Sequence, residues 1–227
     1  MHILIIGGSG RTGELVIDKA ISHGHQVTAL VRKPASLKPR NNLTIVEGTP
    51  INPEDLDKAF TTGADKASVA PNAVVVTLNA RRVSDSPFAA PSPDTPARLM
   101  ADSTANTIAA MKRYNVSKIV IMSSMGTGSS YDGLNFLMRL VFSKTNMKFQ
   151  MVDHNAVDSE TRRAGVEFVL VRPAMLAEGP EAEVKVYPDD GKGIGFMPRI
   201  TRHSVAGFIV RALEGSEFVG RAPVISN

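Results

Sequence analysis

The residues best suited to chemistry stand in the opening stretch IIGGSGRTG, where an apolar run meets three evenly spaced glycines. At this spacing Gly7 allows a tight turn, Gly10 lets the backbone approach a pyrophosphate, and Gly13 allows a helix to pack closely on a sheet. The N–H groups at the start of that helix would face the phosphates. The stretch predicts a dinucleotide-binding loop; the alternative is an ordinary strand-to-helix turn with chance glycines. The loop residues expected to contact the cofactor are Gly7, Gly8, Ser9, Gly10, Arg11, Thr12 and Gly13.

The next apolar run, QVTALV, ends in two basic residues, Arg32 and Lys33. Proteins that bind NAD usually place an acidic residue here, against the ribose 2′-hydroxyl. A carboxylate would repel a 2′-phosphate, whereas a guanidinium pairs with one through two charge-assisted hydrogen bonds. The two residues therefore predict NADP(H) as the cofactor. The alternative is a solvated basic pair at a strand end.

Short, nearly continuous apolar runs rich in β-branched residues are typical of parallel strands that are covered on both faces. Such strands are expected at 2–6, 26–31, 43–47, 73–78, 118–123 and 167–172. Helices are expected at 13–23, 95–114, 146–164 and 203–214. Another helix is expected to begin at Pro53, with Asn52 as its N-cap. Further strands are expected at 184–187 and 222–226. The alternation predicts an α/β fold, with a single doubly wound Rossmann-type parallel sheet, helices on both faces and a small C-terminal substrate-side subregion. Residues 1–227 are expected to form one NAD(P)-binding domain.

Two segments interrupt the alternation of strands and helices. Residues 81–98 contain four prolines and form a long loop at the carboxyl end of the sheet, where ligands of such folds bind. Residues 177–200 are rich in turn formers. We expect these two segments to form the walls of a substrate pocket, with Phe88 on one side and Tyr187, Phe196 and Met197 on the other.

A family resemblance is carried by the stretches IIGGSGRTG, LVRKP, VVTLNA, KIVIMSSMG, DHNAVDSETRRAGVEFVLVRPAML and ITRHSVAGFIVRALE. Together they resemble the atypical short-chain dehydrogenase/reductases, over nearly the whole chain. Within that group the chain looks most like the branch that holds biliverdin reductase B-type flavin reductases and nitrogen-repression-regulator-like proteins. The resemblance implies a Rossmann fold, a nicotinamide cofactor and a site at the carboxyl ends of the strands.

The resemblance also implies further cofactor contacts where strands end. The exit of the fourth strand would pass along the adenosine and ribose, and that of the third would meet the adenine. The exits of the fifth and sixth strands would frame the nicotinamide. In this order, the residues are Leu78, Asn79 and Ala80, then Thr49 and Pro50, then Ser123, and then Pro173, Ala174, Met175 and Leu176. The aspartate that the family usually has beside the adenine is missing from this chain.

Many short-chain reductases use a tyrosine and a lysine, four residues apart on a helix, to protonate the substrate. The three tyrosines here do not fit this pattern. At that spacing, Tyr131 is followed by Asn135, Tyr187 by Gly191, and Tyr114 by Lys118, which begins a strand. The usual acid is therefore absent, or is built from residues that are distant in the sequence.

Two other residues are the candidates for catalysis. Ser124 ends the fifth strand, where the family has its active-site serine or threonine, and it is the best remaining hydrogen-bond donor; alternatively its hydroxyl is tied to the backbone. His154 follows Asp153 as in the family and could position a donor, with a purely structural histidine as the alternative. Met175 stands where biliverdin reductase B-type enzymes carry a histidine, which removes one proton source.

Composition excludes several classes of protein. The 227 residues include no cysteine, which rules out disulfides, thiol nucleophiles and thiolate metal sites. The five histidines are dispersed, so no metal is expected. The formal net charge is +4, but no basic run is interleaved with aromatic residues, and no segment is apolar enough to cross a membrane. We expect a cytoplasmic monomer or weak dimer that binds a small-molecule substrate, and neither nucleic acid nor membrane.

The predicted function is that of an NADPH-dependent reductase. Hydride would pass from nicotinamide C4 to a carbonyl, an activated alkene or a flavin-like ring of a small or medium organic substrate. The missing tyrosine–lysine pair leaves two alternatives open. One is an NADP-binding regulatory or sensor protein without turnover, and the other is a non-redox isomerase or cyclase on the same fold.

Overall fold

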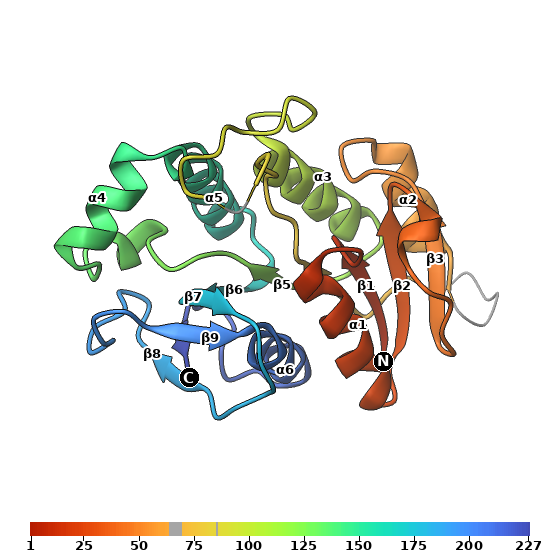
Figure 1. Cartoon of the computed structure of the whole chain (residues 1–227). Coiled ribbons are helices and arrows are strands. Elements are labelled where there is room, and N and C mark those ends of the chain that lie inside the picture. The colour runs from red at the N-terminus through yellow and green to blue at the C-terminus, as the bar shows by residue number, and fades with distance from the viewer. Residues whose placement is uncertain (64–69, 85) are drawn as a thin grey trace.

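The protein has an α/β fold built around one eight-stranded sheet, which confirms the predicted fold class (Figure 1). The computed structural model describes residues 1–63, 70–84 and 86–227. From one edge of the sheet to the other, the strands are β3 (Leu43–Glu47), β2 (Gln26–Val31), β1 (His2–Ile6), β4 (Ala73–Val76), β5 (Lys118–Met122), β6 (Glu167–Pro173), β10 (Val224–Ser226) and β8 (Lys185–Tyr187). Neighbouring strands run parallel except for β8, which is antiparallel to β10.

Helices cover both faces of this sheet. The helices are α1 (Arg11–Ser22), α2 (Pro53–Thr61), α3 (Leu99–Arg113), α4 (Phe136–Lys144), α5 (Met147–Arg163) and α6 (Arg202–Glu214), with 3₁₀ turns η1 (Pro34–Ser36) and η2 (Gly128–Tyr131). α1 packs on α6 on one face, whereas α3 packs against α2 and α5 on the other (Figure 1). The arrangement is the doubly wound one that alternating strands and helices predict.

Burial on both faces explains the continuous apolar runs of the central strands. Ile3 and Ile5 of β1 belong to the core that includes α1 and α6, whereas Leu4 and Ile6 belong to the core that includes α2 and α3. Successive side chains of a strand point to opposite faces, so a strand covered twice needs apolar residues at every position.

A local cap sets the start of α2, and a tertiary contact sets the start of α3. Asn52 caps α2 as predicted, because its side chain accepts a hydrogen bond from the N–H of Glu54. α3 begins at Leu99, later than the expected residue 95, because the carboxylate of Asp153 accepts the N–H groups of Met100 and Ala101. A cap supplied from another helix cannot be seen in the local sequence of α3.

Other elements also differ from the expectation. β4 ends at Val76, two residues before the end of the predicted strand. The sequence does not predict α4, nor the parallel two-stranded sheet formed by β7 (Met175–Ala177) and β9 (Arg199–Thr201). Both additions follow β5, in the part of the fold where the chain departs from simple alternation.

The strand order reverses direction between β1 and β4, which are neighbours in the sheet. In open parallel sheets the loops diverge at such a point and leave a crevice outside the carboxyl ends of the strands. The glycine loop after β1 and residues 77–80 after β4 both lie at this crevice.

Candidate functional site

A cleft with a volume of about 670 Å³ opens at the carboxyl ends of β1, β2 and β4. Many of the residues predicted to bind the cofactor line it, namely Gly7, Ser9, Gly10, Arg11, Thr12, Arg32, Thr49, Pro50, Leu78, Asn79, Ala80 and Leu176. The predicted residues outside its lining are Gly8, Gly13, Lys33, Ser123, Pro173, Ala174 and Met175. The cleft thus brings together chain segments from the first, second, third and fourth strand exits.

The glycines of the loop have separate structural roles. Gly7 has φ of +86°, and a Cβ on it would lie 2.8 Å from the carbonyl carbon of Thr77. A Cβ on Gly13 would lie 2.2 Å from the carbonyl oxygen of Gly7, so the helix can approach the loop only without a side chain there. Gly10 is different, because it lines the cleft and a side chain on it would occupy space that a ligand could use.

The start of α1 suits a bound phosphate. Gly10 is the N-cap residue and offers no side chain, so no side-chain oxygen caps the first turn. The N–H groups of a helix N-terminus and its positive dipole end attract anions. The loop and the helix start therefore fit the pyrophosphate of a dinucleotide.

Thr77 holds the glycine loop in place, and the sequence reasoning missed it. Its N–H donates to the carbonyl oxygen of Ile6 over 2.8 Å, and its hydroxyl donates to that of Gly7 over 3.1 Å. Thr77 also lines the cleft. The available signal was its place as the first polar residue after the buried run AVVV.

The lining of the cleft is strongly basic. Its charged residues are Arg11, Arg32, Arg81, Arg82, Arg202 and Asp94. Arg11 and Arg202 both contact Glu178, with 4.0 Å between Arg11 Nη1 and Glu178 Oε1. Arg32 follows the last residue of β2 and has no ion-pair or hydrogen-bond partner within the described ranges of the chain. A surface of this charge concentrates polyanionic ligands.

An aspartate of α2 holds the exit of β3 in place. The carboxylate of Asp55 accepts a hydrogen bond of 2.8 Å from the N–H of Thr49. Gly48 makes room for this contact, because a Cβ on it would lie 2.6 Å from Cβ of Asp55. Asp55 therefore shapes the loop from α2, while Thr49 and Pro50 face the cleft.

The other end of the cleft is lined by residues from β5, β7 and α5. Met122 ends β5, Leu176 belongs to β7, and Gln150 lies in the first turns of α5. Gln150 donates from Nε2 to Asn79 Oδ1 over 3.2 Å and to the carbonyl oxygen of Ala80. The sequence reasoning did not select Met122 or Gln150, because neither an apolar strand end nor a helical glutamine marks a ligand site by itself.

The two predicted serines follow Met122 in the chain and are not among the lining residues of the cleft. The hydroxyl of Ser124 donates to the carbonyl oxygen of Met125 over 3.0 Å. Ser123 is buried, and its hydroxyl has no partner among the described residues. The backbone tie of Ser124 is the alternative that the sequence left open.

His154 lies away from the cleft lining, and burial gives it an unusual titration. Only 7% of the residue is exposed, and burial lowers the pKa of the imidazole from 6.5 to about 4. Its neighbour Asp153 is occupied in capping α3, and burial raises the pKa of that carboxyl. The geometry therefore keeps the predicted Asp-His pair inside the helix layer.

The titration of His154 predicts how stability depends on pH. The unfolded chain takes up a proton near pH 6.5, but the folded chain does so only near pH 4, so stability falls as the pH drops through this window. We expect the wild-type protein to lose about 2 kcal/mol between pH 7.5 and pH 5 through this group. Urea unfolding of a His154→Leu variant at the two pH values should give a free energy of unfolding that no longer falls by this amount.

The matched control for this experiment is His203→Leu, which removes an exposed histidine from the start of α6. We expect the pH dependence of its unfolding free energy to match that of the wild type. If His154→Leu keeps the wild-type pH dependence, then His154 is protonated in the folded state at pH 5 and the assignment is wrong.

The residues predicted to contact the substrate do not line this cleft. Phe88, Phe196 and Met197 are largely exposed to solvent. Tyr187 lies in the edge strand β8, where its hydroxyl accepts a hydrogen bond from Ser226. Of the two predicted walls, 81–98 contributes Arg81, Arg82, Ser84, Asp94, Thr95 and Pro96 to the lining, whereas no residue of 177–200 does so.

Tyr114 and Lys118 are separated as predicted. Tyr114 is the C-cap of α3 and stacks on Phe60 with 5.3 Å between ring centroids. Lys118 begins β5, and its amine donates to the carbonyl oxygens of Leu213 and Gly215 at the end of α6. Both side chains have structural partners outside the cleft.

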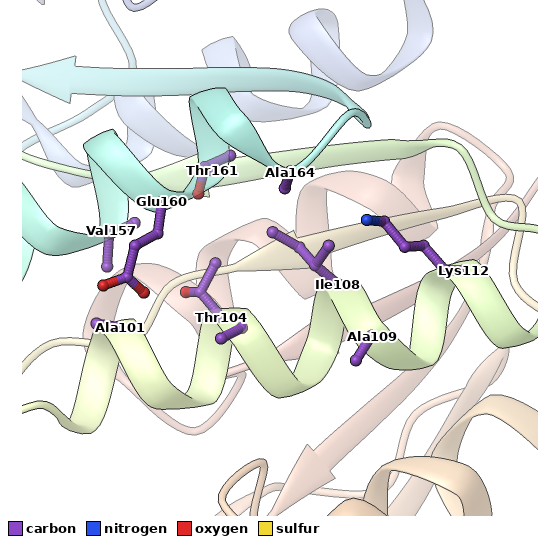
Figure 2. A pocket seen from close by; sticks show the side chains of 10 residues that line it. Ala101, Thr104, Ile108, Ala109, Lys112, Val157, Glu160, Thr161 and Ala164 are labelled. Carbon is purple, nitrogen blue, oxygen red and sulfur yellow. The ribbon is translucent and has the colours of Figure 1, made fainter.

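A smaller hollow lies between α3 and α5, on the outer side of the helix layer. Figure 2 shows alanine, threonine and isoleucine side chains from the two helices around it, with Lys112 and Glu160 as its charged residues. Its volume of about 230 Å³ is a third of that of the cleft, and its uncharged polar groups are the buried hydroxyls of Thr104 and Thr161. We therefore take the larger cleft as the functional site.

Within the described ranges, no group of three or more histidine and carboxylate side chains could hold a metal ion. None of the helices in those ranges is long and apolar enough to cross a bilayer.

Fold and cleft together define a Rossmann-type nucleotide-binding protein. Residues 7–216 match the model of the NAD(P)H-binding family, and the chain belongs to that family. This match covers the glycine loop, every strand exit of the cleft and α6. The nicotinamide cofactor and the Rossmann fold that the sequence resemblance implies are confirmed at the level of this family.

Three solved structures illustrate which proteins share this fold. A short-chain dehydrogenase/reductase of Veillonella parvula, solved in complex with NADP, is 16% identical with a TM-score of 0.76, over 100% of this chain and 94% of its own. The oxidoreductase ylbE of Lactococcus lactis is 15% identical with a TM-score of 0.77, over 100% and 91%. ChuY of Escherichia coli O157:H7, an anaerobillin reductase, is 13% identical with a TM-score of 0.75, over 100% and 97%. At these identities the likeness establishes the fold alone.

Proposed function

We propose that the protein is an NADPH-dependent reductase of a small or medium organic substrate. The observation that carries the proposal is the basic lining of the cleft, with Arg32 at the exit of β2 and Asp94 as the one acidic residue among the described lining residues. NADPH carries a 2′-phosphate in addition to its pyrophosphate, and arginines are the side chains best suited to pair with both. The NADP complex of the Veillonella relative lends support to the same cofactor.

In this proposal each part of the cleft has one task. The glycine loop and the N-terminus of α1 bind the pyrophosphate, and Arg32 binds the 2′-phosphate. Thr49 and Pro50 lie along the adenine, and Leu78 to Ala80 along the ribose. Met122, Gln150 and Leu176 surround the nicotinamide and exclude water from one side of it. Pro173, Ala174 and Met175 support Leu176 from behind.

The chemistry that the cofactor supplies when bound is hydride donation from nicotinamide C4 to a carbonyl, an activated alkene or a flavin-like ring. The chain contributes mainly by positioning the substrate against this atom. Ser124 Oγ lies 3.0 Å from the carbonyl oxygen of Met125, so it would have to leave that bond to donate to a substrate. Solvent at the mouth of the cleft is the proton source that needs no such change.

The test combines binding with turnover. Isothermal titration of the full chain should show tighter binding of NADPH than of NADH. The protein with NADPH is then mixed with a panel of quinones, flavins, aldehydes and activated alkenes, and the loss of NADPH absorbance is followed together with product mass. Tighter binding of NADH, or no binding of either cofactor, would refute the proposal.

The tied hydroxyl of Ser124 and the missing tyrosine–lysine pair favour a second candidate, an NADP-binding sensor without turnover. In that case the same experiment gives tight NADPH binding and no oxidation across the panel. A third candidate, an isomerase or cyclase, would form product without consuming NADPH.

A further inference from the structure

The phenylalanines of this chain fall into two groups. Phe60, Phe142, Phe168, Phe208 and Phe218 are buried, each with at most 9% of its surface exposed. The other four are exposed, with 73% for Phe88, 81% for Phe136, 50% for Phe149 and 67% for Phe196. A folded monomer rarely leaves several aromatic side chains in water, so their positions need an explanation.

The four exposed phenylalanines lie in α4, in the adjoining turn of α5 and in two loops that are hydrogen-bonded to the two ends of α4. Phe136 begins α4, and the cap residue before it, Asn135, donates from its side chain to the carbonyl oxygen of Phe196. At the other end of α4, Asn146 donates from its side chain to the carbonyl oxygen of Phe88 over 2.8 Å. Phe149 follows in the first turn of α5.

Further exposed apolar side chains join these aromatic rings. Leu137 and Leu140 follow Phe136 in α4 by one and four residues, so that the three exposed side chains lie on the same side of the helix. Val152 lies one turn after Phe149 in α5. The α4 surface, as we call it, consists of Phe88, Phe136, Leu137, Leu140, Phe149, Val152, Phe196 and Met197. Figure 1 shows α4 at one end of the molecule, away from the central sheet.

The charged residues of the stretch 133–152, which carries α4 and the start of α5, have one sign. Residues 133–152 contain Arg139, Lys144 and Lys148 and no acidic residue. Lys144 and Lys148 are exposed, and Nζ of Lys148 lies 5.1 Å from the ring centroid of Phe149. The nearest acidic residues in the sequence are Asp132, before α4, and Asp153, which is buried in the cap of α3.

Exposed aromatic and aliphatic residues flanked by lysine and arginine are the pattern of helices that lie in a membrane interface. We propose that the α4 surface docks the protein peripherally on an anionic phospholipid bilayer. The apolar side chains enter the headgroup region, and Lys144 and Lys148 pair with lipid phosphates. A symmetric contact with a second copy would bring these like charges together, which argues against that occupant.

The docking departs from the expectation of no membrane partner and is independent of the proposed reductase function. The docking would nevertheless affect how a substrate reaches the cleft. Phe149 precedes Gln150, which lines the cleft, and the loop 81–98 carries both Phe88 and cleft residues such as Arg81. The mouth of the cleft would therefore lie near the bilayer surface, where apolar substrates partition.

The experiment is flotation of the full chain with vesicles of phosphatidylcholine alone or mixed with phosphatidylglycerol. We expect binding to the anionic vesicles, weak binding to the neutral ones, and release by salt. Lys144→Gln combined with Lys148→Gln should lower the partition coefficient about fivefold per charge. The pair Lys58→Gln and Lys112→Gln, on α2 and α3, removes the same charge elsewhere and should have little effect.

Serine variants on the α4 surface and a control variant elsewhere test the apolar contribution to vesicle binding. Val152→Ser on the α4 surface should weaken vesicle binding several-fold, and Phe136→Ser roughly tenfold, whereas Val186→Ser on the edge strand β8 should not. Because these side chains are exposed, thermal unfolding should be unchanged and verifies that the variants fold. No binding to anionic vesicles, or equal binding to neutral ones, would overturn the proposal. So would a dimer in light scattering that Phe136→Ser dissociates.

Discussion

Replacing Arg32 by glutamate is expected to lower the affinity for NADPH by about ten- to a hundredfold. The guanidinium lies at the exit of β2 in the cleft lining, free of other partners in the described parts of the chain, so it is available to a 2′-phosphate. The variant loses a charge-assisted pair and gains a repulsion. NADH has a 2′-hydroxyl at the same point, which a carboxylate can accept from, and its affinity should stay equal or rise.

The measurement is the ratio of dissociation constants for NADPH and NADH, obtained by titration of wild type and variant. Lys33→Glu makes the same change of charge one residue further on, outside the lining of the cleft. We expect this variant to change the ratio much less, because its charge acts only through solvent. Equal losses in the two variants would show that general electrostatics, and not a contact with Arg32, sets the preference for the cofactor.

The cofactor side of this site could be predicted from the sequence because its signals are local. A glycine that needs positive φ, as Gly7 does, and a glycine against which a helix packs, as Gly13 does, leave their mark on the residue type itself. The apolar runs of the central strands are equally local, since each is buried on both faces. These signals placed the strand exits and, through them, most of the cleft.

The substrate side could not be predicted in the same way, because its signals depend on tertiary contacts. The aromatic residues Phe88 and Phe196 resemble pocket walls by type, but hydrogen bonds from Asn135 and Asn146 place their backbones at the two ends of α4. The apolar stretch FLMRLVFSK has no polar face that would mark a helix packed on a core. His154 looks like a donor by type, whereas its burial, which lowers the pKa of the imidazole, depends on tertiary packing.

A buried ion pair joins the sheet to α5, η2 and the loop after β8. Arg172 of β6 is fully buried, and its Nη2 donates to Asp158 Oδ2 of α5 over 2.6 Å. Its Nη1 donates to Ser129 Oγ in η2 and to the carbonyl oxygen of Asp189. Burial lowers the pKa of this guanidinium, and Asp158 partly restores it. One side chain therefore ties together β6, α5, η2 and the loop after β8.

Removing the carboxylate of Asp158 should lower the free energy of unfolding more than any of the other single substitutions. Asp158→Ala leaves the Arg172 charge buried without its partner, which costs about 3–5 kcal/mol of unfolding free energy. Asp102→Ala, which breaks the exposed pair with Arg98, should cost about 1 kcal/mol or less. Urea unfolding of both variants measures the difference, and similar costs would show that the buried pair is solvated. Replacing both partners, Asp158→Leu with Arg172→Met, should recover much of the loss, because the cost lies in the unpaired charge and not in the missing contact.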